Sequence, residues 1–594
     1  MNQTGQTANE YAYRPVTLTP DTGAVGFPME RGLFGHNLEV TRKGFFRGLY
    51  AQMLNNRKLF MGDDLVDGWA CTNARRITDR PEESLCRSRF VILKNGCMKQ
   101  KGDTVTLQAG KRYEAKVWVK AYSEKAAVTF GAEGFAQTFS LTADGEPYTA
   151  LSFEFDGADV ACGTFFVSAE GEVAVYEVSL MPTDHFHGMR RDVIESLRAL
   201  KPTSIRYPGG CYADHFEWRE SLKAPEFRAP VDGRSKGFML RDSYHQDCVE
   251  VGLNEFILLC RELGAEPEYT VSHLRSDGED ARCLMEYCNG SADSEYGAKR
   301  EALGLSPFGI KVWYIGNESY YSGGPYCLDG GLAGERTNEI VRAMRRVDPD
   351  MQPVLCLVSD HHLRPWSRAF MEKLDCPYEY VSYHWYYGTG PTAEPDGAIA
   401  CEHMKQTYLH DTDEGLEFYK NELLADVWDQ VRVCVDEWNF CWGSASNNAL
   451  LISNALQLHF FARNAEKYHL RDARFFMPVN EGMITVTPTA SKVESSGELI
   501  RLMSEHLNGV VIPCTAEGDQ LDILCTKHED RLFVSVVNRS DENLRIGMAG
   551  YEPTSCTEIR MDELSFFSNN YEIVAGTEPT IRPFSVSFMT FTPA

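Results

Sequence analysis

Two glutamates follow strongly apolar runs in the second half of the chain. Glu318 ends residues 312–318 and Glu437 ends residues 431–437, and both runs have the composition of buried strands. Cleavage of a glycosidic bond with retention needs one carboxylic acid to protonate the leaving oxygen and one carboxylate to attack the anomeric carbon, about 5–5.5 Å apart. A lone strand-end glutamate is more often an ion-pair partner. Two such glutamates, each at the end of a similar apolar strand, predict a catalytic pair.

Such a pair must be held at one end of a parallel sheet. Residues 185–490 alternate apolar, β-branched runs with amphipathic helical runs, which predicts a parallel sheet with right-handed crossovers. With residues 32–39, the strands number eight, the count of a closed (β/α)₈ TIM barrel, whose catalytic groups lie at the carboxyl ends of its strands. The other seven predicted strands are residues 204–210, 268–272, 312–318, 354–359, 380–384, 431–437 and 474–480.

The fold class predicted is therefore α/β plus all-β. Residues 1–63 hold an N-terminal segment, the first barrel strand and a helical run near residues 46–60. Short alternating runs separated by Gly, Asp and Ser at 64–184 predict an inserted β-sandwich of carbohydrate-binding type, with a structural or glycan-binding role left open. Residues 185–490 complete the catalytic barrel, and 491–594 form a C-terminal β-sandwich, to which residues near the N-terminus add a strand.

The amino-acid composition limits the kinds of molecule that the protein is expected to bind. The 594 residues carry a net charge of −26, which opposes binding to nucleic acid or to anionic membrane surfaces and favours a neutral substrate. No run of eighteen apolar residues occurs, and no apolar leader follows Met1. The 18 cysteines show no CxxC pair and often lie in apolar runs, which indicates reduced thiols. We expect a cytoplasmic protein without a membrane span.

The ordered motifs resemble one enzyme family. Residues 315–318 (Ile-Gly-Asn-Glu) and 436–439 (Asp-Glu-Trp-Asn) are similar to the two active-site motifs of the α-L-arabinofuranosidases of glycoside hydrolase family fifty-one. The resemblance implies Glu318 as general acid/base and Glu437 as nucleophile. Its longer branch carries a sandwich inserted after the first strand, as predicted here. Further similar segments are residues 34–39, 47–51, 56–57, 206–212, 255–256, 264–267 and 286–290.

The resemblance also implies roles for residues around the pair. Each of these is expected to line the sugar pocket or to orient the nucleophile: Glu39, Arg206, Cys211, Asn317, His384, Trp385, Tyr386 and Trp442. Aromatic faces pack on apolar sugar faces, so Trp385, Trp438 and Trp442 are candidate platforms, although any of them can equally be core.

Some pocket positions depart from the family pattern. Cys211 stands where the shorter branch has an asparagine, and Met477 where many members have a glutamine. Because neither replacement supplies an amide, the departures bear on the sugar rather than on the reaction.

The function predicted is a retaining exo-α-L-arabinofuranosidase that acts on arabinofuranoside oligosaccharides. No cofactor and no metal are predicted, since the paired histidines at 185 and 187 and at 361 and 362 lack supporting ligands. The family also suggests a homo-oligomer. Two alternatives stay open: a related enzyme of the same clan that cleaves another furanoside, a β-glucan or a xylan, and a non-catalytic carbohydrate-binding protein.

Overall fold

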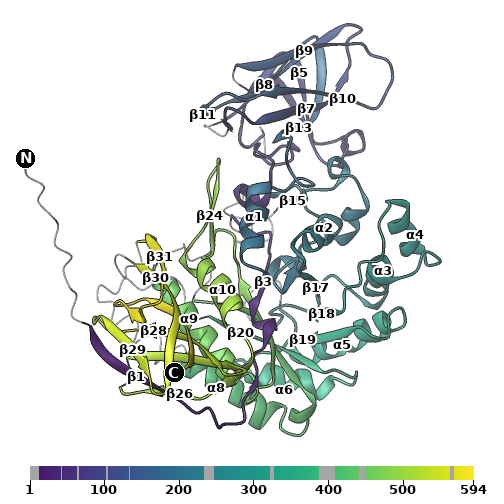
Figure 1. Cartoon of the computed structure of the whole chain (residues 1–594). Helices are drawn as coiled ribbons and strands as arrows, with labels where there is room; N and C mark the ends of the chain where they lie inside the picture. The colour runs from purple at the N-terminus through teal and green to yellow at the C-terminus, as the bar shows by residue number, and fades with distance from the viewer. Residues whose placement is uncertain are drawn as a thin grey trace, which may run out of the picture.

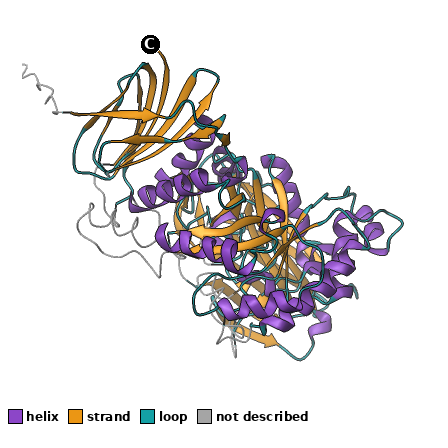
Figure 2. Ribbon diagram, turned by 90° about the horizontal axis from the view of Figure 1, so that it is seen from below, coloured by secondary structure: helices purple, strands orange, loops and turns teal. Residues whose placement is uncertain are grey.

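Eight parallel strands close into a barrel at the centre of the computed structural model (Figures 1 and 2). The structure describes residues 13–41, 43–62, 66–101, 105–132, 134–232, 246–321, 327–386, 409–440, 448–518, 520–561 and 568–594. The barrel confirms the predicted TIM fold. Its strands follow one another in chain order, and the last pairs with the first: β3 (Gly35–Asn37), β14 (Ser204–Tyr207), β17 (Glu266–Val271), β18 (Val312–Ile315), β19 (Gln352–Leu355), β20 (Tyr380–Tyr386), β21 (Arg432–Asn439) and β22 (Leu470–Phe476).

Helices between the strands cover the outside of the barrel (Figure 2). Side chains at the first turns cap several of them: Asp277 accepts from the backbone N–H of Asp280, and Asp329 from that of Gly331. The helices are α1 (Arg191–Ala199), α2 (Leu253–Leu263), α3 (Gly278–Asn289), α4 (Glu295–Ala302), α5 (Gly330–Arg345), α6 (Arg364–Lys373), α8 (His410–Phe418), α9 (Asn448–Asn464) and α10 (Ser495–His506). No helix in the described part of the chain is long and apolar enough to cross a membrane.

The helical run predicted near residues 46–60 is wrong. The chain forms only the short turn η2 (Phe45–Leu49), and Arg47 and Asn56 have positive φ angles of 60° and 45°. The Asn56 amide donates to the Asp67 carbonyl at 2.8 Å, and its amide oxygen accepts from Met61 N at 3.1 Å. These tertiary contacts replace the helical hydrogen bonds that an apolar run by itself suggests.

An antiparallel sheet is inserted between β3 and β14, and it lies at the top of Figure 1 with its own buried core. Its eight main strands follow the order β10-β7-β13-β5-β12-β8-β9, with β4 on β5, while β6 pairs with β11. The strands are β4 (Trp69–Ile77), β5 (Phe90–Gln100), β6 (Val105–Leu107), β7 (Arg112–Ala121), β8 (Ala126–Ala132), β9 (Phe135–Leu141), β10 (Thr149–Asp156), β11 (Val160–Gly163), β12 (Phe165–Glu170) and β13 (Glu172–Pro182).

A second antiparallel assembly ends the chain. The predicted N-terminal contribution is confirmed, because β1 (Arg14–Pro20) pairs in parallel with β29 (Leu544–Met548) and antiparallel with β26 (Cys514–Ala516). The remaining strands are β2 (Phe27–Pro28), β25 (Val510–Ile512), β27 (Leu521–His528), β28 (Arg531–Asn538), β30 (Tyr551–Met561), β31 (Tyr571–Gly576), β32 (Thr580–Ile581) and β33 (Val586–Pro593). The short hairpins β15 (Val231–Asp232) with β16 (Gln246–Asp247) and β23 (Ile484–Val486) with β24 (Ser491–Val493) stand apart from these sheets.

Buried polar contacts join both sheets to the barrel. Arg57 lies before the insert, and its guanidinium contacts Glu177 of β13 at 2.6 Å and also Glu250 beside the barrel. On the other side, His459 of α9 contacts Asp522 of β27 at 2.7 Å. Because an unpaired buried charge is costly, these contacts fix where each sheet docks.

Candidate active site

A β-bulge in β21 brings two consecutive carboxylates to the same cluster. Ser382 and His384 of β20 pair with Cys434 and Glu437, so β21 carries one residue more than its neighbour, and its register with β22 shifts at the same place. Consecutive side chains of a regular strand point to opposite faces, whereas a bulge re-aims one of them. As a result, Asp436 and Glu437 both contact Arg206.

Three donors surround the Glu437 carboxylate. Arg206 donates from Nη1 to Oε1 at 2.9 Å, Asn37 donates to the same oxygen at 3.5 Å, and the Tyr386 hydroxyl donates to Oε2 at 2.8 Å. Gly210 makes room, since a Cβ there would lie 2.3 Å from Oε1. Burial and the neighbouring Glu318 raise the pKa of Glu437, while His384 and Arg206 oppose that rise. The three donors hold the carboxylate in one orientation.

Glu318 faces Glu437 from the end of β18. Its φ of 42° places it in the left-handed region, an unusual conformation for a residue with a side chain and a frequent one at functional sites. One carboxylate oxygen of Glu318 lies within 4.8 Å of one of Glu437. The Glu318 side chain is 15% exposed, against 5% for Glu437. Glu318 is therefore the member of the pair that solvent reaches.

His384 bridges the cluster from β20. Its Nδ1 lies 3.0 Å from Glu318 Oε1, and its Nε2 lies 2.9 Å from Asp436 Oδ2. Burial lowers the pKa of His384, but the charges of Glu437 and Asp436 outweigh it and hold that pKa well above its ordinary value. In turn, His384 and Arg206 outweigh burial and lower the pKa of Asp436. Both ring nitrogens thus face carboxylates, which favour the protonated form of the ring.

Glu318, His384 and Glu437 could in principle gather around a metal ion, because each offers an atom within 4.8 Å of the others. A metal, however, needs a neutral imidazole. The charges of Glu437 and Asp436 raise the pKa of His384, so a metal ion would have to displace a proton that these carboxylates favour.

The other predicted pocket residues on this side gather around Asn317. Its Oδ1 accepts from Arg206 Nη2 at 2.7 Å, and its Nδ2 lies 3.7 Å from the Cys211 sulfur. The Cys211 thiol in turn lies 3.6 Å from Glu318 Oε2, and burial followed by the charge of Glu318 raises the pKa of that thiol well above its usual range. Glu39, also buried, accepts from the backbone N–H of Tyr212 at 2.7 Å. The structure thus brings these residues together beside the two glutamates.

Comparison with known proteins finds similarity to α-L-arabinofuranosidases. Residues 196–398 match the model of the Alpha-L-arabinofuranosidase 1 domain. An intracellular exo-alpha-(1->5)-L-arabinofuranosidase of Acetivibrio thermocellus is 28% identical over 274 residues, which cover 45% of this chain and 52% of that protein. Alpha-L-arabinofuranosidase 2 of Arabidopsis thaliana is 26% identical over 62% of this chain and 59% of that protein. The chain spans about half the length of these curated relatives.

Solved structures extend the likeness to nearly the whole chain. The family fifty-one arabinofuranosidase of Xanthomonas axonopodis pv. citri matches with a TM-score of 0.63 and 14% identity over 97% of this chain and all of that one. The predicted resemblance to glycoside hydrolase family fifty-one is confirmed. A second structure, the alpha-L-arabinofuranosidase of Thermotoga maritima, has a TM-score of 0.59 and 21% identity over 68% of this chain and 90% of that one. At these identities, the family fifty-one structures establish the fold.

The three tryptophans predicted as sugar-stacking platforms differ in what the structure shows of them. Trp438 is 1% exposed and packs edge-on against Phe461 and Phe475, so it belongs to the core. Trp385 is partly buried against the same core, and its pocket role stays a prediction. Trp442 lies outside the described residues. Met477 is fully buried, consistent with the absence of a polar contact at this position.

Two residues of the cluster were missed by sequence reasoning. Asp436 was quoted in a motif but given no role, because strand alternation predicts that it points away from Glu437. Asn37 offered a usable signal, since it lies two residues before Glu39 and therefore on the same face of the strand predicted for residues 32–39. Only the first of these omissions required the structure to correct it.

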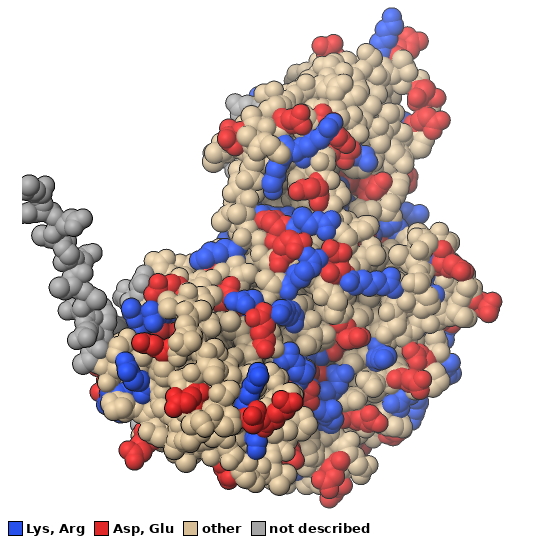
Figure 3. All heavy atoms as spheres, in the orientation of Figure 1, with Lys and Arg blue, Asp and Glu red and all other residues tan. Residues whose placement is uncertain are grey.

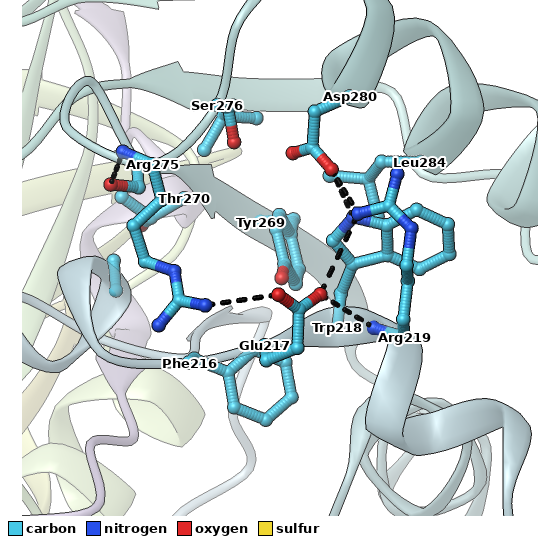
Figure 4. A pocket seen from close by; sticks show the side chains of 13 residues that line it. Phe216, Glu217, Trp218, Arg219, Tyr269, Thr270, Arg275, Ser276, Asp280 and Leu284 are labelled. Atoms are coloured by element: carbon cyan, nitrogen blue, oxygen red, sulfur yellow. Dashed lines mark hydrogen bonds and ion pairs between the residues drawn. The ribbon is translucent and has the colours of Figure 1, made fainter.

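A separate hollow lies beside the loop that follows β14 (Figure 4). Its charged groups satisfy one another: Arg275 donates to Glu217 at 2.9 Å, and Arg219 contacts both Asp280 and Glu217. Two cations thus balance two carboxylates, and neither Glu318 nor Glu437 lines the hollow. We therefore place the chemistry at the glutamate pair and not here.

Proposed function

We propose that this protein is a retaining exo-α-L-arabinofuranosidase with Glu437 as nucleophile and Glu318 as general acid/base. The observation that carries the proposal is the pair of carboxylate oxygens within 4.8 Å of each other. Carboxylates about 5–5.5 Å apart act by double displacement, whereas inverting enzymes need about 6.5–9.5 Å to admit a water molecule. The names of the relatives support the arabinofuranoside as substrate.

In the first step, Glu437 attacks the anomeric carbon while Glu318 gives its proton to the leaving oxygen. The C–O bond to the leaving group breaks, and an ester forms between the sugar and Glu437. In the second step, Glu318 takes a proton from water, whose oxygen attacks the same carbon and releases the carboxylate. Arg206 and Tyr386 orient the nucleophile, and their hydrogen bonds stabilise it when it leaves.

The remaining pocket groups are proposed to hold the sugar. Asn317 and Glu39 present an amide and a carboxylate beside the glutamates, where hydroxyls of a furanose can reach them. Several relatives are named intracellular, which supports a cytoplasmic site of action on imported oligosaccharides. On the face shown in Figure 3, acidic and basic side chains are interspersed, which suits a neutral substrate better than a polyanion.

The decisive experiment follows hydrolysis of an aryl α-L-arabinofuranoside by NMR. The first product formed should keep the anomeric configuration of the substrate. Glu437→Ala should lower turnover by about 10⁴-fold or more, as loss of a catalytic nucleophile does in other hydrolases. Glu335→Ala removes an exposed carboxylate of α5 and serves as the matched control.

Two outcomes would contradict the proposal. An inverted first product would show that Glu437 does not act as a nucleophile. Near-wild-type turnover by Glu437→Ala would show that the double-displacement mechanism is wrong. A panel of other aryl furanosides and pyranosides tests the substrate separately. Preference for a pyranoside would favour the alternative of a related glucanase or xylanase, and inactivity on the whole panel would favour a binding protein.

A further inference from the structure

Tyr321 is the one exposed Phe, Tyr or Trp side chain in the described part of the chain. It is 61% exposed, although it follows Glu318 by only three residues. An exposed aromatic ring beside a proposed catalytic group offers a face on which a ligand can pack. The mechanism above gives Tyr321 no role.

The backbone and the ring of Tyr321 are both held in place. Its N–H donates to the Glu318 carbonyl at 3.0 Å, which closes a turn directly after the catalytic residue. The ring stacks on Tyr320, with centroids 5.9 Å apart and an interplanar angle of 26°. Tyr320 is buried, and it packs edge-on against Trp366 at 5.6 Å. One face of an exposed ring is therefore supported by the core.

The backbone contact with Glu318 and the charges that act on the phenol show that Tyr321 lies close to the proposed acid/base residue. The charge of Glu318, followed by burial, raises the pKa of Tyr321 to about 12, with smaller contributions from Cys211, Asp360 and Glu437. The phenol is thus neutral at physiological pH and lies within reach of the catalytic carboxylates.

The closeness of Tyr321 to Glu318 matters for substrate binding, because the leaving group must present its oxygen to the proton donor. If the proposed function holds, the sugar that departs lies next to Glu318, and Tyr321 is the exposed aromatic residue three positions after Glu318. The apolar C–H face of a sugar packs well on an aromatic ring. Asp360, which is also near, would disfavour an acidic sugar at this place.

We propose that Tyr321 is the stacking platform for the leaving-group sugar, and that it selects a neutral sugar at that position. The proposal rests on the proposed function and goes beyond it, since it assigns a specificity-determining residue on the far side of the scissile bond. The same platform would seat a sugar acceptor when the glycosyl-enzyme is intercepted by a sugar in place of water.

The test compares two substrates that differ only in the leaving group: a neutral arabinofuranosyl disaccharide and methyl α-L-arabinofuranoside. Tyr321→Ala should lower the ratio of kcat/KM for disaccharide over methyl glycoside by about five- to tenfold, the size of one aromatic stacking contact. Tyr321→Phe keeps the ring and should keep the ratio. Leu332→Ala, which removes an exposed side chain of α5, is the matched control for truncation at the surface.

A second readout does not depend on rates. With a neutral sugar added as acceptor, Tyr321→Ala should divert less of the glycosyl-enzyme to the transfer product than wild type does. Equal kcat/KM ratios and equal product partition in wild type and Tyr321→Ala would overturn the platform. Failure of the proposed function is distinguishable, because then the wild type itself would cleave neither substrate.

Discussion

Two buried arginines lie inside the barrel, and the clusters around them differ in one respect. Arg206 on β14 contacts Asp436 and Glu437, whereas Arg474 on β22 contacts Glu268 at 2.8 Å and Asp472 at 3.0 Å. Tyr314 of β18 lies between them: its hydroxyl donates to Glu268 at 3.1 Å, and the Arg206 guanidinium stands 4.7 Å from its ring centroid. The barrel interior thus holds two groups of charged side chains. The lower layer consists of Arg471, Arg474, Glu268 and Asp472. The upper layer consists of Arg206, His384, Asp436, Glu437 and Glu318.

In the lower layer, the positive and negative groups are equal in number. Arg471 also contacts Glu268 and Asp472, so two guanidinium groups face two carboxylates, and the side chains of Arg474, Glu268 and Asp472 are no more than 3% exposed. Of these four groups, Arg471 is 23% exposed, and the other three are shielded from solvent.

Among the ion-paired groups of the upper layer, the carboxyls outnumber the cations by one. Arg206 and His384 are matched by Asp436 and Glu437, and Glu318 is the additional carboxyl. Two carboxylates that share a site favour retention of one proton between them. Glu318 is the more exposed of the pair and has no guanidinium contact among the described residues, so its carboxyl is the one that water or a leaving group can reach more easily. We therefore expect the lower layer to stabilise the barrel, and the upper layer is the one proposed to perform the reaction.

The largest effect in this comparison is expected from removal of the additional carboxyl. Glu318→Ala should slow release of the glycosyl-enzyme by about 10²–10⁴-fold, the usual contribution of general acid–base catalysis. Azide needs no general base, so it should restore turnover with an aryl arabinofuranoside and yield a glycosyl azide of retained configuration. The measurement is turnover against azide concentration, with NMR of the product.

In contrast, azide with Glu437→Ala should yield the inverted azide, because attack then comes from the face that the nucleophile occupied. Retained azide from Glu437→Ala and inverted azide from Glu318→Ala would exchange the two roles. No rescue of either variant would count against the double displacement.

Breaking the lower layer should change stability and not chemistry. Arg474→Met leaves Glu268 and Asp472 buried beside a single cation, and removal of one partner of a buried pair costs about 3–5 kcal/mol of unfolding free energy. Arg368→Met removes an arginine from an exposed pair with Glu422 and should cost at most about 1 kcal/mol. Denaturant unfolding measures both.

The kcat of the folded Arg474→Met protein should stay near that of wild type. If Arg474→Met unfolds no more easily than Arg368→Met, the lower layer contributes little. If instead kcat falls sharply while the protein stays folded, the two layers are coupled through Tyr314, and their separation into stability and catalysis is wrong.

The comparison also shows what the sequence could predict. Buried parallel strands form nearly continuous apolar runs, so the eight barrel strands and the glutamates at the ends of two of them were accessible. The bulge in β21 could not be predicted from the sequence, because the extra residue is recognised only from the pairing of β21 with β20 and with β22. Asp436 was therefore missed. Trp438 was ambiguous for a related reason: composition does not distinguish an aromatic that lines a pocket from one buried behind it.

The smallest effect concerns the orientation of the nucleophile. Tyr386→Phe removes one hydrogen bond to Glu437 Oε2, while Arg206 and Asn37 still hold Oε1. A hydrogen bond to a charged group contributes about 1.5–3 kcal/mol, so kcat should fall by about 10- to 100-fold. KM for an aryl arabinofuranoside should change little, since the lost bond orients the enzyme's own carboxylate.

Tyr383→Phe is the matched control on the same strand. Its hydroxyl donates to the Thr412 carbonyl of α8 at 3.2 Å, away from the glutamates, so its loss should leave kcat near that of wild type. Equal losses in the two variants would mean that β20 responds to any lost hydroxyl. A rise in KM with unchanged kcat in Tyr386→Phe would instead make this tyrosine a contact of the sugar. Only a kcat loss confined to Tyr386→Phe supports a role of this hydroxyl in orienting Glu437.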